Sequence, residues 1–192
     1  MNKKYELLEN DTKDWFGIKL FRIKALVVIS SFVAAGDVGG YVQSEKNLDV
    51  SGDAWVYGDA WVYGDARVSG DARVYGDARV SGNALVSGNA WVSGNAWVSG
   101  NAWVSGNALV QKPADIQTYS GVGSSYGTLT VYRTKDGIEL TRGCFQGSLE
   151  KFRAAVIAEH GETSKFGKSY LGIANLIEFW FYLEPVEDRK AA

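Results

Sequence analysis

A six-residue repeat that begins at Gly52 constrains the fold more than any other feature of this chain. Ten units follow one another without an insertion: GDAWVY, GDAWVY, GDARVS, GDARVY, GDARVS, GNALVS, GNAWVS, GNAWVS, GNAWVS and GNALVQ. A period this strict is typical of a solenoid, in which every unit takes an equivalent position in a repeating coil.

Each unit alternates small or aliphatic residues with variable ones. Ala54 and Val56 point to the same side of an extended segment, whereas Trp55 and Tyr57 point to the other side. Glycine followed by Asp or Asn suits a tight corner, because these residues tolerate left-handed backbone angles. The unit therefore predicts a short strand with an inward Ala-x-Val face and a turn at the end of every unit.

One unit cannot be stable alone, because burying a valine gains roughly 1.5–3 kcal/mol whereas ordering each backbone residue costs roughly 1–2 kcal/mol. Stacked coils add backbone hydrogen bonds at a spacing of about 4.8 Å and enclose a core of Ala and Val. We therefore expect a mainly β protein built on a single-stranded parallel β-helix.

The Ala-x-Val phrase and its short turn resemble the hexapeptide repeat of left-handed parallel β-helices. This resemblance implies that three units form one triangular coil and that the helix has about four coils. The family carries Gly, Ala, Glu or Asp directly after its aliphatic residue. This chain instead has residues such as Tyr57 and Ser69 there, with its glycine one place later, so a right-handed coil is the alternative.

A coil of three units stacks the outward residues into three columns, since each residue then lies over its counterpart three units later. The columns are Trp55, Arg73, Trp91 and Leu109; Trp61, Arg79 and Trp97; and Arg67, Leu85 and Trp103. Arginine falls between tryptophans in the first two columns, within reach of cation–π contacts worth about 0.5–2 kcal/mol each. The candidate site residues are the Trp and Arg members: Trp55, Trp61, Arg67, Arg73, Arg79, Trp91, Trp97 and Trp103.

A monomer rarely leaves so large an apolar surface in water. One interpretation buries the columns against another subunit or a terminal domain, and the other makes them a groove that binds a ligand or partner. Hexapeptide β-helices of the kind that the repeat resembles commonly associate as trimers. We therefore expect a homotrimer.

The corner residue is Asp in the first five units and Asn in the last five. Stacked carboxylates repel one another, whereas stacked Asn side chains can form a hydrogen-bonded ladder. Turn chemistry beside Arg67, Arg73 and Arg79 explains the Asp residues without a cation, so we predict no metal and no cofactor.

Residues 1–35 are expected to form a β cap, because an open β-helix end exposes unpaired backbone groups and invites polymerisation. A strand over residues 5–8, a polar loop around Asn10 and Asp11, and one or two strands over residues 18–29 are predicted. The β-helix then spans residues 36–112. Its first units are degraded: Val38 and Val50 take valine positions, and Val42 and Leu48 take alanine positions.

The segment from Gly36 to Leu48 and the KYELL phrase at residues 4–8 resemble a group of phage and prophage hexapeptide-repeat proteins. Members of this group are often described as putative acyltransferases from the repeat alone. The resemblance covers residues 1–110 and implies a phage or prophage origin.

The period changes after Pro113. Residues 113–120 are predicted to be a linker, and residues 121–192 a small ββαα module. The module is expected to contain a hairpin over residues 127–134 and 138–142, a helix capped by Ser148 that ends near His160, and a second helix over residues 168–182 that Pro185 stops.

Composition excludes several classes. The formal net charge is −2 and basic residues are scattered, which argues against nucleic acid as a partner. A single cysteine, Cys144, precludes an intrachain disulfide and favours a reducing compartment. The longest apolar run, residues 25–35, is too short for a bilayer. We expect a soluble cytoplasmic protein, in the host cytoplasm if phage encoded, with no membrane partner.

The hexapeptide resemblance also implies an acyltransferase, in which a histidine serves as general base and acyl-coenzyme A lies along the prism. The repeats here contain no histidine, and no loop interrupts them. The sole histidine, His160, is expected at a helix end, Cys144 as a packed thiol, and the glycine-rich residues 121–125 as a linker or turn.

The leading hypothesis is therefore a non-catalytic, trimeric binding or scaffold protein. It would engage a host protein or sequester a small anionic ligand such as a signalling nucleotide, with a role in counter-defence if the chain comes from a phage. An acyltransferase using acyl-coenzyme A and a structural virion component are the alternatives.

Overall fold

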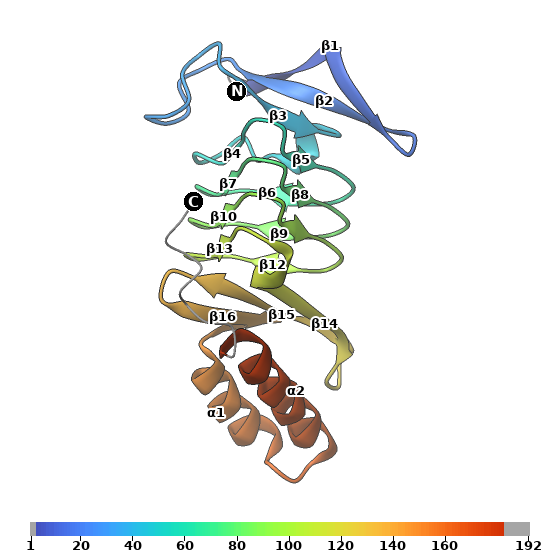
Figure 1. Ribbon diagram of the computed structural model, residues 1–192, viewed down its shortest axis with the longest axis vertical. Coiled ribbons are helices and arrows are strands. Elements are labelled where there is room, and N and C mark those ends of the chain that lie inside the picture. Colours follow the sequence, from blue (N-terminus) through green and yellow to red (C-terminus); the bar gives the residue numbers. More distant parts are fainter. Residues whose placement is uncertain (1–2, 183–192) are drawn as a thin grey trace. The chain divides into compact units, whose positions relative to one another are not determined.

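The computed structural model describes residues 3–182, which divide into two units (Figure 1). One contains residues 3–117 and 132–135, and the other contains residues 118–131 and 136–182. Each unit has its own buried core.

A parallel β-solenoid of about four turns forms most of the first unit (Figure 1). Its strands are β4 (Trp55–Val56), β5 (Trp61–Val62), β6 (Arg67–Val68), β7 (Arg73–Val74), β8 (Arg79–Val80), β9 (Leu85–Val86), β10 (Trp91–Val92), β11 (Trp97–Val98), β12 (Trp103–Val104) and β13 (Leu109–Val110). They pair in the orders β4-β7-β10-β13, β5-β8-β11 and β6-β9-β12. Trp91 pairs with both Arg73 and Leu109, so the predicted stacking of every third unit is confirmed.

The interior consists of the repeat alanines and valines, none of which is more than 2% exposed between Ala54 and Val110. The corner glycines from Gly52 to Gly106 have φ between 57° and 71°, the left-handed region that a Cβ disfavours. Asn83 donates to Asn101 across one corner at 3.0 Å, which confirms the predicted amide ladder at that pair.

The first coil departs from the six-residue frame. It contains β3 (Val38–Val42) and the 3₁₀ helix η1 (Glu45–Asn47). Val42 pairs with Val62, so the two residues are two positions farther apart in the sequence than paired residues of the later coils, which are separated by three repeat units. Leu48 bridges to Val68 with the same offset. Val42 and Leu48 therefore occupy valine positions, and the prediction that Val38 and Val50 point inward is wrong, since they are 53% and 58% exposed.

Two additional residues explain this shift. The segment from Leu48 to Val56 is longer by two positions than the segment between successive inward valines of the repeat, such as Val56 and Val62. The excess is accommodated by the loop after Leu48, where Ser51 N and Oγ both donate to Asp49 Oδ1 at 2.9 Å.

An antiparallel hairpin, β1 (Tyr5–Trp15) and β2 (Ile18–Ala25), precedes the solenoid and continues through β3 into the β5-β8-β11 sheet (Figure 1). The predicted polar loop at Asn10 and Asp11 is wrong, because both residues lie within β1 at a register shift between Leu8 and Thr12. A bulge absorbs these residues, and the chain reverses at Phe16 and Gly17 instead.

Backbone carbonyls at the exposed edge of the first regular coil are satisfied by the segment before it. Lys4 Nζ donates to the carbonyls of Asp49, Gly52 and Ala54 at 3.2, 2.9 and 2.9 Å. Asn47 Nδ2 donates to the carbonyls of Gly64 and Ala66 at 3.0 and 2.9 Å. Side chains thus complete the capping that a strand would otherwise supply.

The second unit is built on a four-stranded sheet, in the order β14-β15-β16-β17, and two helices (Figure 1). The elements are β14 (Ile116–Val122), β15 (Gly127–Thr134), β16 (Gly137–Arg142), β17 (Phe145–Gly147), α1 (Leu149–His160) and α2 (Lys165–Tyr182). The predicted hairpin is confirmed as β15 and β16. Two further strands extend it, and β14 includes part of the segment predicted as a linker after the 3₁₀ helix η2 (Pro113–Asp115).

Both predicted helices are present. Ser148 Oγ accepts from Lys151 N, which confirms the predicted N-cap of α1, and His160 is the last residue of that helix. Helix α2 begins at Lys165 rather than at Lys168 as predicted, after Ser164 Oγ accepts from Gly167 N. The predicted stop at Pro185 lies outside the described residues.

Candidate functional site

The eight predicted site residues lie on three different sheets of the solenoid. Trp55, Arg73 and Trp91 belong to the β4-β7-β10-β13 sheet, Trp61, Arg79 and Trp97 to the β5-β8-β11 sheet, and Arg67 and Trp103 to the β6-β9-β12 sheet. One ligand site on one sheet cannot contain all of them.

The first column is partly covered by residues that precede the repeat. Trp55 is 1% exposed, and its ring meets Tyr5 edge to face with centroids 6.2 Å apart. The Arg73 guanidinium lies 4.7 Å from the Phe32 ring and 5.4 Å from the Trp91 ring. Trp55 is therefore a core residue here, and Arg73 stacks within the chain.

The second column is covered in the same way. The Arg79 guanidinium lies 4.5 Å from the centroids of both Trp15 and Trp61, and those two rings meet at 5.2 Å. Trp97 is the most exposed member of this column, at 53%, and its Nε1 donates to Ser81 Oγ at 3.4 Å. The predicted cation–π contacts are present for one tryptophan in each column: Arg73 meets Trp91 and Arg79 meets Trp61.

The third column is exposed to solvent along its length. Arg67 and Leu85 pair side by side, as do Leu85 and Trp103, and all three side chains are exposed. Within residues 3–182, the Arg67 guanidinium has no hydrogen bond, ion pair or ring contact. Among the arginines of the columns in the described part of the chain, Arg67 therefore differs from Arg73 and Arg79 in making no cation–π contact.

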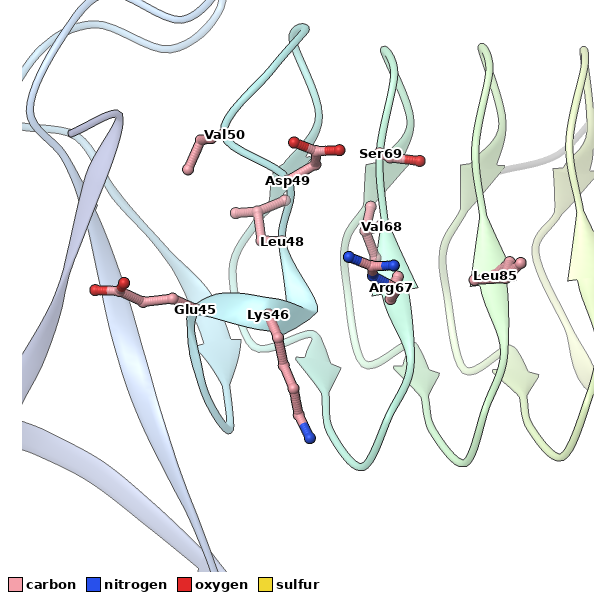
Figure 2. Close-up of a pocket in the computed structure, with 9 residues that line it drawn as sticks. All are labelled: Glu45, Lys46, Leu48, Asp49, Val50, Arg67, Val68, Ser69 and Leu85. Atoms are coloured by element: carbon pink, nitrogen blue, oxygen red, sulfur yellow. The ribbon is translucent and has the colours of Figure 1, made fainter. Parts of the chain in front are cut away.

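A cavity of about 310 Å³ lies at the end of this column. We call it the Arg67 groove; it is lined by Glu45, Lys46, Leu48, Asp49, Val50, Arg67, Val68, Ser69 and Leu85 (Figure 2). Strands β6 and β9 supply Arg67 and Leu85, while η1 and the irregular loop after Leu48 supply the residues before the repeat. Figure 2 shows Lys46 and Glu45 extending away from Arg67.

Among the described residues, Glu45 and Lys46 at the groove form ion pairs with Lys3 and Asp65, whereas Asp49 and Arg67 form none. Hydrogen bonds from Ser51 N and Oγ hold the pKa of Asp49 below its usual range, with Lys4 and Arg67 adding to the effect and burial opposing it. A 2.7 Å ion pair with Lys46 lowers the pKa of Asp65. The groove therefore offers one free guanidinium fork beside a fixed carboxylate and the apolar side chains of Val50 and Leu85.

Sequence reasoning identified Arg67 but missed the other wall of the groove. That wall is the segment from Glu45 to Val50, where the six-residue frame breaks. The break itself is the available signal, because an interruption in a strict repeat leaves side chains that no neighbouring coil covers.

No group of three or more His, Cys, Asp or Glu side chains within residues 3–182 is arranged to hold a metal ion. In the same part of the chain, neither helix has the length and apolar character required to cross a membrane.

A family model described as the YdcK β-solenoid repeat matches residues 60–76, 66–80, 78–94 and 90–106. No curated protein matches the chain. The matched segments fall within the coils that carry the three columns. The strands of these coils pair in parallel in the structure, as a β-solenoid requires. The chain is therefore a repeat β-helix protein, and its coils are similar to the YdcK β-solenoid repeat.

Proposed function

We propose that the protein is a non-catalytic binding protein that forms a homotrimer through the β6-β9-β12 sheet and holds a small anionic ligand in the Arg67 groove. The observation that carries the proposal is the exposed Arg67 side chain, which lies beside Leu85 in the groove (Figure 2). Leu85 pairs in turn with Trp103, so the row continues along one sheet.

Exposed apolar side chains on this sheet support self-association through it. Leu85 and Trp103 are each 39% exposed. Trp91 and Trp97 on the other two sheets are 38% and 53% exposed, but those sheets also carry contacts from Tyr5, Phe32 and Trp15, which precede the repeat. Burying an exposed Leu or aromatic side chain gains about 1.5–3 kcal/mol, so a second copy placed on this row removes unfavourable surface. Around a threefold axis, each subunit offers the same row to the assembly.

The ligand class follows from the chemistry of the row. A free guanidinium favours a phosphate or carboxylate, and Asp49 beside it accepts from a hydroxyl. Trp103 lies two coils from Arg67, a separation of about 10 Å at the usual strand spacing. A nucleotide with its phosphate on Arg67 is long enough to extend along this row between subunits, where its base has apolar and aromatic side chains to pack against.

A left-handed, triangular coil is the finer description that we propose for the solenoid. Three sheets in which every third unit stacks support the triangular cross-section, and the resemblance of the repeat supports the handedness. The phage or prophage origin, the role in host-defence inhibition and the cytoplasmic location stay predictions.

Native mass spectrometry of protein purified gently from cells tests the proposal. We expect a trimer that retains a small mass. Arg67→Ala should give a bare trimer, because the guanidinium binds the ligand without supporting the coil. A Leu85→Ser, Trp103→Ser double variant should give monomers with an unchanged far-ultraviolet spectrum, because both side chains project from the row.

Trp97→Ser is the matched control, since it removes an exposed tryptophan from a different sheet. It should leave both the trimer and the retained mass unchanged. A wild-type monomer would rule out the trimer. A mass that survives Arg67→Ala, or a wild-type trimer with no retained mass, would rule out the groove as the ligand site.

A further inference from the structure

The second unit contains a cavity of about 500 Å³, in the size range of small-molecule sites. It lies between the loop before β15, the β16–β17 turn and the two helices. It brings together residues that are far apart in the sequence, including the chain's only cysteine, Cys144, and its only histidine, His160. All of its lining residues belong to the second unit, so it is independent of the Arg67 groove.

An aromatic chain forms one wall of this cavity. Phe145 meets Phe152 edge to face at 5.4 Å, and Phe152 meets Tyr170 in the same way at 5.7 Å. Tyr170 in turn stacks on His160, with ring centroids 5.6 Å apart and planes inclined by 15°. These mutual contacts hold the rings in place, so the wall is preformed for a flat apolar group.

Arg142 supplies the charge of the cavity. Its Nη2 donates to the carbonyl of Val122 and to Ser125 Oγ, both at 2.9 Å, which fixes the guanidinium. Gly127 gives it room, because a Cβ at that position would lie 2.5 Å from Nη1. The side chain is therefore held in one orientation by the loop that borders the cavity.

The remaining donors of Arg142 are not used within the described part of the unit. Its Nε is buried without a hydrogen-bond partner, and no carboxylate forms an ion pair with it within residues 3–182. A guanidinium that is fixed, partly buried and unpaired is unfavourable unless an anion meets it. Glu159, which also lines the cavity, is exposed and forms no ion pair with Arg142.

We propose that this cavity is a second ligand site, which takes a small molecule carrying an oxyanion on an aromatic ring. The oxyanion, a carboxylate or a phosphate, binds the Arg142 guanidinium where it lines the cavity. The ring packs along Phe145, Phe152 and Tyr170. Glycine at 127 and serine at 125 serve to position Arg142 and do not themselves select the ring.

Cys144 provides a direct measurement of occupancy. It is the only thiol in the chain, it is exposed, and it lines the cavity. Its rate of alkylation by iodoacetamide, followed by intact-mass spectrometry, is therefore sensitive to a molecule bound beside it. The probes are phenylacetate and phenyl phosphate, and benzyl alcohol is the uncharged control.

We expect phenylacetate, phenyl phosphate or both to slow the alkylation of Cys144 at least about threefold, with saturation at or below roughly 10 mM, the range expected of such small ligands. Benzyl alcohol should have no comparable effect. Which anion protects better identifies the ligand as a carboxylate or a phosphate. If neither anion protects Cys144 in folded wild-type protein, the proposal is overturned.

Arg142→Gln should abolish the protection, and Arg153→Gln is the matched control. Arg153 is an arginine of α1 that is already engaged by Glu178 and Asn175, and it does not line the cavity. Protection that persists in a folded Arg142→Gln variant overturns the proposal. If that variant does not fold, Ala155→Trp tests whether the cavity is the ligand site. Ala155 is an exposed lining residue, and a bulky side chain there fills the cavity. Ligand-dependent protection should then disappear, and its persistence counts against the site.

Discussion

Lys4→Met is expected to lower the free energy of unfolding of the solenoid by about 2–4 kcal/mol, because it leaves backbone carbonyls at the edge of the first regular coil without a donor. Lys4 is 5% exposed and donates to the carbonyls of Asp49, Gly52 and Ala54. Methionine keeps a stem of similar size and removes only the ammonium group. Urea titration followed by far-ultraviolet circular dichroism measures the loss.

Burial lowers the pKa of Lys4, and nearby Asp53, Asp49 and Asp71 oppose that shift. The Lys4 ammonium is therefore partly desolvated but hydrogen-bonded. Its removal lowers stability chiefly because the three carbonyl acceptors lose their donor. The buried bond to Ala54 contributes most, because water cannot replace it. An uncovered edge also offers unpaired backbone groups to another chain, so the variant should show concentration-dependent light scattering.

Lys3→Met is the matched control. Lys3 forms an ion pair with Glu45 at 2.6 Å, but both side chains are more than half exposed. Exposed pairs of this kind contribute about 0–1 kcal/mol, so the control should unfold close to wild type. Equal losses in the two variants would show that Lys4 does not cap the coil.

The repeat made the solenoid predictable, because a period of six fixes both the inward residues and their neighbours. Each inward Ala and Val, and each outward pair such as Trp91 and Arg73, follows from counting along the sequence. The backbone hydrogen bonds between coils then follow from the same period. Where the sequence leaves the period, at Val38 and Val50, the same counting placed exposed side chains in the core.

The caps were not predictable from local pattern. Lys4 and Ala54 are distant in the sequence, and the hydrogen bonds of Asn47 to Gly64 and Ala66 depend on how η1 meets the next coil. Short polar side chains that satisfy backbone groups leave no periodic signal. Strands β14 and β17 were missed for a related reason, since they are defined by pairing with β15 and β16 rather than by their own composition.

The candidate site was predicted only in part. All eight Trp and Arg residues have the same sequence context, yet their environments differ because Tyr5, Trp15 and Phe32 cover part of two of the three columns. No repeat pattern shows where a preceding hairpin docks. Likewise, Cys144 was expected to be packed, but the structure exposes it at a tight turn beside Arg142. That prediction was wrong because the β16–β17 turn was not recognised.

Stacking of the corners should give the other large effect. Gly82 and Gly100 have nearly identical backbone angles, with φ of 67° and 66°, and they lie one above the other in successive coils. A Cβ on Gly82 would lie 2.9 Å from Gly100 N and 3.0 Å from Gly100 O, whereas a Cβ on Gly100 meets nothing within 4 Å. Alanine at either position is strained by its backbone angle, but only at Gly82 does it also collide with the next coil.

Gly100→Ala should therefore cost about 1–2 kcal/mol of unfolding free energy, the usual penalty for a Cβ in the left-handed region. Gly82→Ala should cost about 1–3 kcal/mol more, as other overpacking substitutions do. The coils cannot move apart locally to relieve the contact, because Asn83 N donates to Gly100 O at 2.8 Å and Leu85 N donates to Ala102 O at 2.9 Å. Paired urea titrations of the two variants isolate the stacking contribution, since the backbone penalty is common to both. If the unfolding midpoints of the two variants coincide, a Cβ at Gly82 does not collide with Gly100. Glycine at position 82 is then required by its backbone angle alone and not by contact with the next coil.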